Sequence, residues 1–233
     1  QHGEQLHIEL SQSRFLYDNL LEEGNDTTLW QVPYRVIAPD TIGNASGLMS
    51  SKDDDLTLTS PTGGNDDYWI KLNGGQTGFY RVNYSPEGWS NLRSAIEEHK
   101  LPAVDRLGIQ NDAYALVKGG YLPATDFLSI IEAYKNEVDS SVWSDLATNL
   151  RGMENLLSDE PWLTQFRNSA RSLFSNISKK VGWDPSPDEG HLDSILRTVV
   201  LGQAGSYGDP EVIGEAQRKF GEFLNDPSSV HPD

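Results

Sequence analysis

The chain has 233 residues, a formal net charge of −17, no cysteine and 36% apolar residues. That length fits one large domain or two small ones, and the apolar content with six tryptophans is enough for a folded core. Eighteen basic against thirty-five acidic residues argue against a surface for nucleic acid or anionic membranes. The lack of cysteine excludes disulfides and thiolate metal sites.

The first third of the chain has the patterns of short β-strands. Leu6, Ile8 and Leu10 alternate with polar residues, which is the period of a strand buried on one face. Pro33 removes a backbone donor and therefore favours an edge or a bulge. The expected strands lie at residues 6–10, 14–17, 30–34, 56–58, 68–73 and 78–84, and the last two are the clearest because aromatic and β-branched residues are frequent in them.

Turn-rich breaks separate these segments. They lie at 22–28, 39–46 and 60–67, and a glycine-rich turn follows at 74–77. The acidic run 53–55 lacks the alternation and distal glutamate of a calcium loop, so we interpret it as a solvated loop. Several short strands at this spacing indicate a small β-sandwich.

From Pro86 onward the apolar period becomes helical. Trp89, Leu92 and Ile96 recur at intervals of three and four, and the same spacing continues down the chain. Proline in the first turn and glycine after the end mark one helix at 161–181. The other helices are expected from 86, at 104–118, at 125–136, from 141, from 191 and from 210.

Seven such helices with short connections suggest successive antiparallel pairs, as at the start of a helical solenoid. The fold class expected from the sequence is therefore α+β and multidomain. Residues 1–85 are expected to form a β-sandwich domain, and residues 86–233 the N-terminal half of an α-helical solenoid domain.

Known catalytic motifs are missing from the sequence. None of the five histidines has a second histidine four residues away, no H-E-x-x-H occurs, and no serine lies in a G-x-S-x-G turn. The carboxylate–histidine cluster at 189–193 stands at an expected helix start, where acidic residues favour the helix dipole, so we interpret it as a cap. The sequence predicts no catalytic, cofactor-binding or metal-binding residue in this chain.

Three collinear segments nevertheless resemble one family, the gluzincin zinc aminopeptidases. Residues 69–84, with Gly78-Phe79-Tyr80-Arg81-Val82-Asn83-Tyr84, resemble the last strands of the small β-sandwich in that family. Residues 101–116 resemble the early helix of its C-terminal helical domain. Residues 182–197 are most similar to the puromycin-sensitive branch, and the matches extend over about residues 11–224.

The resemblance implies that this chain is a non-catalytic C-terminal part of a zinc aminopeptidase. The family's zinc ligands and catalytic glutamate have no matching positions here, so zinc would belong to a catalytic domain outside this chain. That domain and a peptide substrate would be the partners. The later half of the solenoid would also be missing, so some hydrophobic faces near the C-terminus would lack a neighbour.

One motif is a decoy. Gly152-Met153-Glu154-Asn155 is similar to the exopeptidase loop of the family, whose glutamate holds the substrate's amino group. In the family this loop precedes the zinc helix, whereas here the motif lies late on an amphipathic helix and no zinc helix comes after it. We therefore interpret it as coincidental.

Several motif residues have physical roles that need no catalysis. Asp105 and Arg106 are expected to cap and pair around a helix start. Asn111 and Asp112 have poor helix propensity but stand in mid-helix, which indicates either a specific polar contact across the domain interface or simple exposure to water.

Two other hypotheses remain open. The sandwich and helices could be a stand-alone protein-interaction module with a concave face. An independent hydrolase using acidic pairs is the third interpretation, although no sugar-binding signature supports it. The chain has no apolar run long enough for a membrane helix, and we expect a cytoplasmic location.

Overall fold

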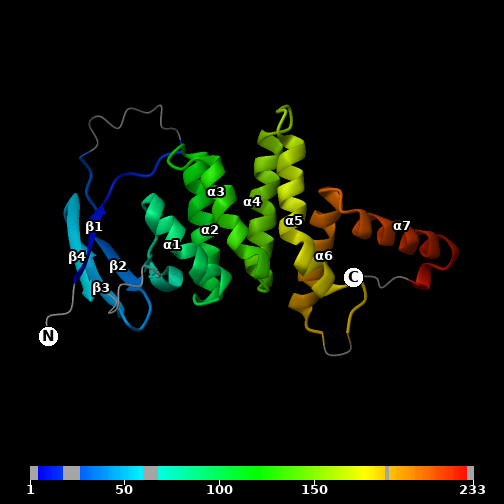
Figure 1. Cartoon of the computed structure of the whole chain (residues 1–233), viewed down its shortest axis with the longest axis horizontal. Helices are drawn as coiled ribbons and strands as arrows, with labels where there is room; N and C mark the ends of the chain where they lie inside the picture. The colour runs from blue at the N-terminus through cyan, green and yellow to red at the C-terminus, as the bar shows by residue number, and fades with distance from the viewer. Residues whose placement is uncertain (1–4, 18–26, 60–67, 187–188, 230–233) are drawn as a thin grey trace. The chain divides into compact units, whose positions relative to one another are not determined.

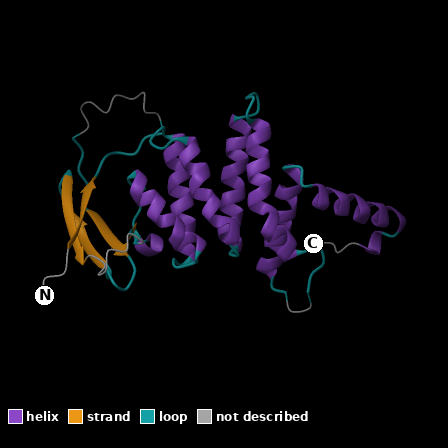
Figure 2. Cartoon of the chain, in the orientation of Figure 1, coloured by secondary structure: helices purple, strands orange, loops and turns teal. Residues whose placement is uncertain are grey.

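The computed structural model of the chain describes residues 5–17, 27–59, 68–186 and 189–229. The chain folds into two compact units, Gln1–Ala133 and Tyr134–Asp233, and each is described by itself. All the strands lie in the first unit, followed by three helices, and the second unit is helical (Figures 1 and 2).

The strands form two small antiparallel sheets. β1 (Gln5–Ser11) pairs with β4 (Asp53–Thr59). The second sheet has the order β3-β2-β5, with β3 at Ala45–Met49, β2 at Val32–Ile37 and β5 at Lys71–Leu72. Side chains from both sheets share one core, which contains Val36, Ala38, Ile42, Leu56 and Leu58. This arrangement is the small sandwich that the alternation predicts.

Helices α1, α2 and α3 complete the first unit. α1 (Pro86–Glu97) begins with a serine cap, because Ser85 Oγ accepts a hydrogen bond from Gly88 N. α2 (Ala103–Lys118) ends at Gly119. α3 (Ala124–Ile131) packs on α2 and passes into the 3₁₀ turn η3 (Glu132–Asn136). The first helix begins at Pro86, where the sequence predicts it.

The second unit contains α4 (Ser140–Leu156), α5 (Leu163–Val181), α6 (His191–Ser206) and α7 (Pro210–Asn225). An aromatic group forms its core: the ring centroids of Trp143 and Phe174 are 4.8 Å apart, and those of Phe174 and Tyr207 are 6.0 Å apart. All seven expected helices are present, so the α+β fold class is confirmed.

Two strand predictions are wrong. Residues 14–17 are irregular, because Phe15 packs its ring on Tyr121 at 5.5 Å instead of joining a sheet. Residues 78–84 contain no strand either, although their composition is typical of one. Their backbone bonds to side chains of the sandwich and of α2. The expected strand at 68–73 is reduced in the described residues to the two residues of β5.

One loop prediction is wrong, and another is wrong only at its last two residues. β3 falls partly within the break expected at 39–46, because its small residues look like a turn; Gly47 lies opposite Tyr34, and a Cβ there would stand 2.4 Å from the Tyr34 hydroxyl oxygen. The acidic run 53–55 is exposed but belongs to β4 rather than to a loop. The breaks expected at 60–67 and at most of 22–28 lie outside the described residues.

Candidate functional site

The most highly organised polar group in the described residues is a cluster of four charged side chains, which we call the junction cluster. It consists of Lys71 from β5, Arg81 from the segment 78–84 that follows β5, and Asp105 and Asp112 from α2. The side chains of Lys71, Asp105 and Asp112 are only 1%, 2% and 3% exposed. Two positive and two negative charges are thus gathered between the sandwich and α2, where each buried charge needs a partner.

Asp105 lies in the first turn of α2 and connects this helix to β5 and to the loop that contains Gly75. Its Oδ1 accepts a hydrogen bond from Gly75 N at 2.8 Å and lies 3.7 Å from Lys71 Nζ. A negative charge in the first turn is also favoured by the helix dipole. Asp105 is not the cap, since Pro102 occupies that position, and Arg106 instead donates from Nη1 to Leu101 O at 2.5 Å.

Asp112 makes the corresponding contact two turns later. Its Oδ1 accepts from Arg81 Nη1 at 3.0 Å, and its Oδ2 accepts from Val82 N at 3.2 Å. Asn111 Oδ1 also accepts from Arg81 Nη1. Of the two interpretations of Asn111 and Asp112, the specific polar contact is therefore confirmed. A carboxylate in mid-helix is tolerated here because it replaces the strand partner that Val82 lacks.

The ammonium group of Lys71 contacts two carbonyl oxygens and one carboxylate. It donates to Leu72 O and to Asn73 O, and it faces Asp105. Burial lowers the pKa of Lys71, and the charges of Asp105 and Asp112 oppose that shift. Burial raises the pKa of Asp112, against the hydrogen bond and charge of Arg81. The two shifts have one cause, since desolvation disfavours the charged form of each group.

The loop that contains Gly75 and Gln76 packs closely on α2. Gly108 lies under the side chain of Gln76, and a Cβ at this position would stand 1.7 Å from Gln76 Nε2. Tyr84 closes the other side, because its hydroxyl oxygen accepts a hydrogen bond from Leu72 N at 3.1 Å. The cluster therefore holds three segments together through contacts that occupy its charged groups. Such an arrangement positions the backbone and leaves these groups engaged with one another.

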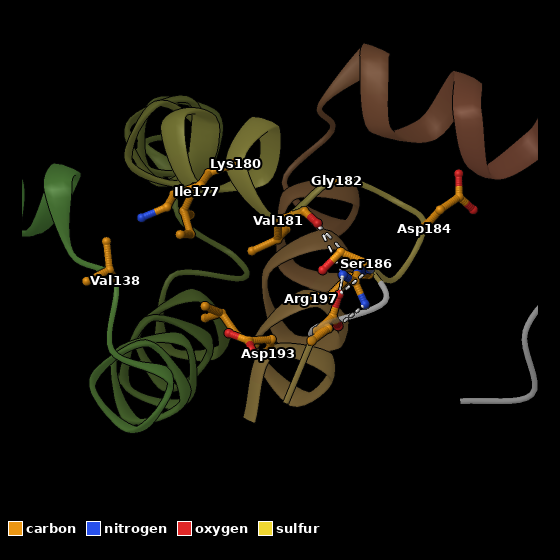
Figure 3. Close-up of a pocket in the computed structure, with 11 residues that line it drawn as sticks. Val138, Ile177, Lys180, Val181, Gly182, Asp184, Ser186, Asp193 and Arg197 are labelled. Carbon is orange, nitrogen blue, oxygen red and sulfur yellow. Dashed lines mark hydrogen bonds and ion pairs between the residues drawn. The ribbon is translucent and has the colours of Figure 1, made fainter. Parts of the chain in front are cut away.

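A separate pocket lies in the second unit, between the end of α5 and the start of α6 (Figure 3). It encloses about 560 Å³. Arg197 dominates it: its Nη1 and Nη2 donate to both oxygens of Glu189, while Nε and Nη2 donate to Val181 O at 3.3 Å. The hydrogen bond to Glu189 raises the pKa of Arg197.

Other polar residues that line this pocket are also engaged. Asp193 Oδ2 accepts from Gly190 N at 3.0 Å, so the cap expected in the cluster at 189–193 is confirmed. Asp184 pairs with Lys219 at 2.7 Å. The pocket thus lies beside the segment that Arg197 joins to the end of α5, and several of its charged groups bind one another.

The remaining sequence motifs have structural places. Glu154 lies on α4 and accepts from Arg167 Nε on α5 at 2.6 Å, which is an ordinary interhelical ion pair. Among the described residues, no three or more His, Cys, Asp or Glu side chains gather as metal ligands would. No helix in the same part of the chain is long and apolar enough to cross a membrane.

One helix exposes the kind of apolar face that the resemblance implies near the C-terminus. Val212 is the only residue of α7 that is buried. Phe220 is 61% exposed and Leu224 68%, and the rings of Phe220 and Phe223 are stacked at 6.5 Å. Hydrophobic side chains on one face of an amphipathic helix normally pack against a neighbour.

Comparisons with known proteins agree with this architecture. The family model for the ERAP1-like C-terminal domain matches residues 69–233. Aminopeptidase M1-B of Oryza sativa subsp. japonica is 34% identical over 232 residues, which are 96% of this chain and 26% of the relative. Aminopeptidase M1 of Arabidopsis thaliana is 32% identical over 231 residues, which are 94% of this chain and 26% of the relative. Aminopeptidase 2 of Candida albicans is 29% identical over 228 residues, which are 97% of this chain and 24% of the relative.

The fold is that of a protein in which a small sandwich is followed by a series of helices, with the buried ion pair Lys71–Asp105 between the sandwich and α2. The chain spans about a quarter of the length of the curated relatives that it matches. It belongs to the ERAP1-like C-terminal domain family. The resemblance to aminopeptidases seen in residues 69–84, 101–116 and 182–197 is thereby confirmed.

Proposed function

We propose that this chain is a non-catalytic part of a zinc-dependent aminopeptidase that removes N-terminal residues from peptides. Its role in that enzyme is to support and enclose the chamber in which the substrate is held. The observation that carries the proposal is the match itself: 94–97% of this chain is similar to one quarter of several aminopeptidases.

The described residues support a structural role. The charged groups of the junction cluster already bind one another, and Arg197 and Glu154 bind neighbouring helices and loops. Zinc does not fit this part of the chain, since it needs three or four ligands that converge and the described side chains bring no such group together. We place zinc on a catalytic domain of the same polypeptide, which is also the main partner of this chain.

The charge of the chain suggests a second contribution to the same activity. With a net charge of −17, it creates a negative potential that attracts cations. The substrate of an aminopeptidase carries a positive α-amino group, so the acidic surface would favour its entry. The same acidity also maintains solubility, and this simpler role does not depend on the enzyme.

The domain division at 85/86 and a cytoplasmic location remain predictions. Pro86 is the first residue of α1, yet the junction cluster and α2 place the sandwich within the same compact unit as three helices. Fractionation of the source cells, with an antibody raised against this chain, would test the location.

The first experiment is an immunoblot of source-cell extract with that antibody. We expect a band several times larger than 25.9 kDa, and aminopeptidase activity that co-purifies with it and is lost on treatment with a chelator. The purified 233-residue chain should neither bind stoichiometric zinc nor cleave aminoacyl substrates. A band only at the size of the chain would contradict the proposal and favour the interaction module, for which the exposed face of α7 is the supporting observation.

A further inference from the structure

Phe79 is the most exposed large hydrophobic residue in the described structure. Its relative exposure is 109%, whereas Phe127, Phe166 and Phe174 are all below 5%. An aromatic ring in water forgoes the largest hydrophobic contribution that a side chain can make. Single exposed hydrophobic residues are common, so exposure alone assigns no role. The backbone that carries Phe79 provides the further evidence.

The backbone next to Phe79 is held in place on both sides. Asn73 binds Gly78 twice: Asn73 Oδ1 accepts from Gly78 N at 2.7 Å, and Asn73 Nδ2 donates to Gly78 O at 2.9 Å. After the ring, Arg81 and Val82 are bound to Asp112. The ring is therefore presented by a fixed backbone, which lowers the entropy that binding would cost.

The same loop contains unfavourable backbone conformations. Asn73 has φ of 55° and Gln76 has φ of 54°, in the left-handed region that non-glycine residues seldom adopt. Such conformations persist where the surrounding contacts impose them, and they are concentrated at binding and functional sites. Here Asp105, through Gly75 N, and Asn73 itself impose them.

The residues around Phe79 carry no charge, a feature that they share with the centres of protein interfaces. Charged residues make up 23% of the chain, yet residues 72–80 contain none. Interface centres are depleted of charge and enriched in aromatic residues, and a few such residues carry most of the binding energy. An uncharged, fixed loop with one protruding ring matches that description.

We propose that the loop at residues 73–79, which we call the Phe79 loop, docks Phe79 into an apolar pocket on the remaining part of the same aminopeptidase polypeptide. This inference rests on the proposed function, because it assigns the surface through which the chain contacts the rest of the enzyme. A second copy of the chain is disfavoured, since two bodies of charge −17 repel each other. A partner on the same polypeptide, in contrast, has a high effective concentration.

The test measures solvent access at the rim of the loop. The chain has no cysteine, so Thr77→Cys places a single thiol next to Phe79, and Ser90→Cys on the exposed face of α1 is the matched control. Each variant is made in the 233-residue chain and in the full polypeptide, and maleimide labelling of the relevant peptide is followed by mass spectrometry. We expect the thiol of Thr77→Cys to react about tenfold more slowly in the full polypeptide, and that of Ser90→Cys to react equally in both.

Adding Phe79→Ala should restore fast labelling at Thr77→Cys in the full polypeptide. The same substitution should leave the melting temperature of the 233-residue chain unchanged, because the exposed ring contributes no packing there. Equal labelling rates of Thr77→Cys in both proteins would overturn the inference. Protection that grows with the concentration of the isolated chain would overturn it too, by identifying a second copy as the occupant.

The aminopeptidase activity of the full polypeptide separates the two proposals. Activity without protection of the Phe79 loop would refute the docking surface alone. Protection without any aminopeptidase activity would refute the proposed function and leave the loop as an interface of another protein.

Discussion

Each unit of the molecule has an ion pair that joins two of its elements, and these two pairs differ in burial. In the first unit, Lys71 and Asp105 are 1% and 2% exposed and join β5 to α2. In the second, Arg167 and Glu154 are 47% and 17% exposed and join two neighbouring helices. When one partner of a buried pair is removed, water cannot take its place beside the remaining charge. At an exposed pair, water can do so. The difference suggests that charge fixes the packing of the sandwich on α2, while apolar contacts fix the packing of α4 on α5.

The largest effect is expected from Lys71→Met. This change leaves Asp105 buried without its cation, and removal of one partner of a buried pair typically costs about 3–5 kcal/mol of unfolding free energy. Urea unfolding of the 233-residue chain measures it. The double variant Lys71→Met/Asp105→Asn should recover part of the loss, because the amide oxygen can still accept from Gly75 N. A single-variant loss below about 1 kcal/mol would show that the pair does not hold the junction.

Gly108→Ala should have the next largest effect. Its new methyl group would overlap the side chain of Gln76, and overpacking of this kind costs about 1–3 kcal/mol. Gly202→Ala is the control, because no atom lies within 4 Å of the added Cβ and alanine is the better helix former. Thermal unfolding should therefore show opposite signs for the two variants. A stabilising effect of Gly108→Ala would mean that Gln76 moves aside freely.

The pH dependence of Asp112→Asn is a finer test of the junction cluster. The folded-state pKa of Asp112 is raised above 3.8 by burial. As the pH rises through this window, the unfolded chain releases the proton before the folded chain does, so the stability that Asp112 contributes falls. Because Asp112→Asn does not titrate, its destabilising effect should be largest at and below about pH 4 and smaller at about pH 7. Urea unfolding at several pH values would show the opposite trend if the ionised carboxylate is net stabilising.

The smallest effect is expected from Arg167→Gln. Nearly half of the Arg167 side chain is exposed, so the loss of its pair with Glu154 should change the unfolding free energy by less than about 1 kcal/mol. Raising the salt concentration should reduce the difference between this variant and the wild type. A loss as large as that of Lys71→Met would remove the contrast between the buried pair and the exposed pair.

Helices were predicted well from the sequence because their signals are local. The starts at Pro86 and Pro210 and the stops at Gly119 and Gly182 are properties of a few neighbouring residues. Strands were predicted less well, since pairing depends on distant residues. β3 was missed because Gly47 looks like a turn until Tyr34 is known to lie opposite.

Only part of the candidate site could be predicted from the sequence. The poor helix propensity of Asn111 and Asp112 indicated a polar contact, which is a signal that the sequence carries. Nothing local identifies Lys71 as the partner of Asp105, since 34 positions separate them and the pattern around Lys71 is that of any strand residue. The sequence also did not indicate the exposure of Phe79, since it stands in the strand-like segment 78–84, whose other aromatic residues are of the kind that supply core area.

The bonding of residues 78–84 has a consequence for aggregation. This segment has the composition of a strand but no strand partner in the described structure, and such segments can recruit identical chains through their unpaired backbone. Here Asn73 covers the amide and carbonyl of Gly78, and Asp112 covers the amide of Val82. The side chains that fix the junction thus also cover the backbone of residues 78–84. Loss of Asp112 would expose the amide of Val82, and this segment could then pair as a strand with other copies of the chain.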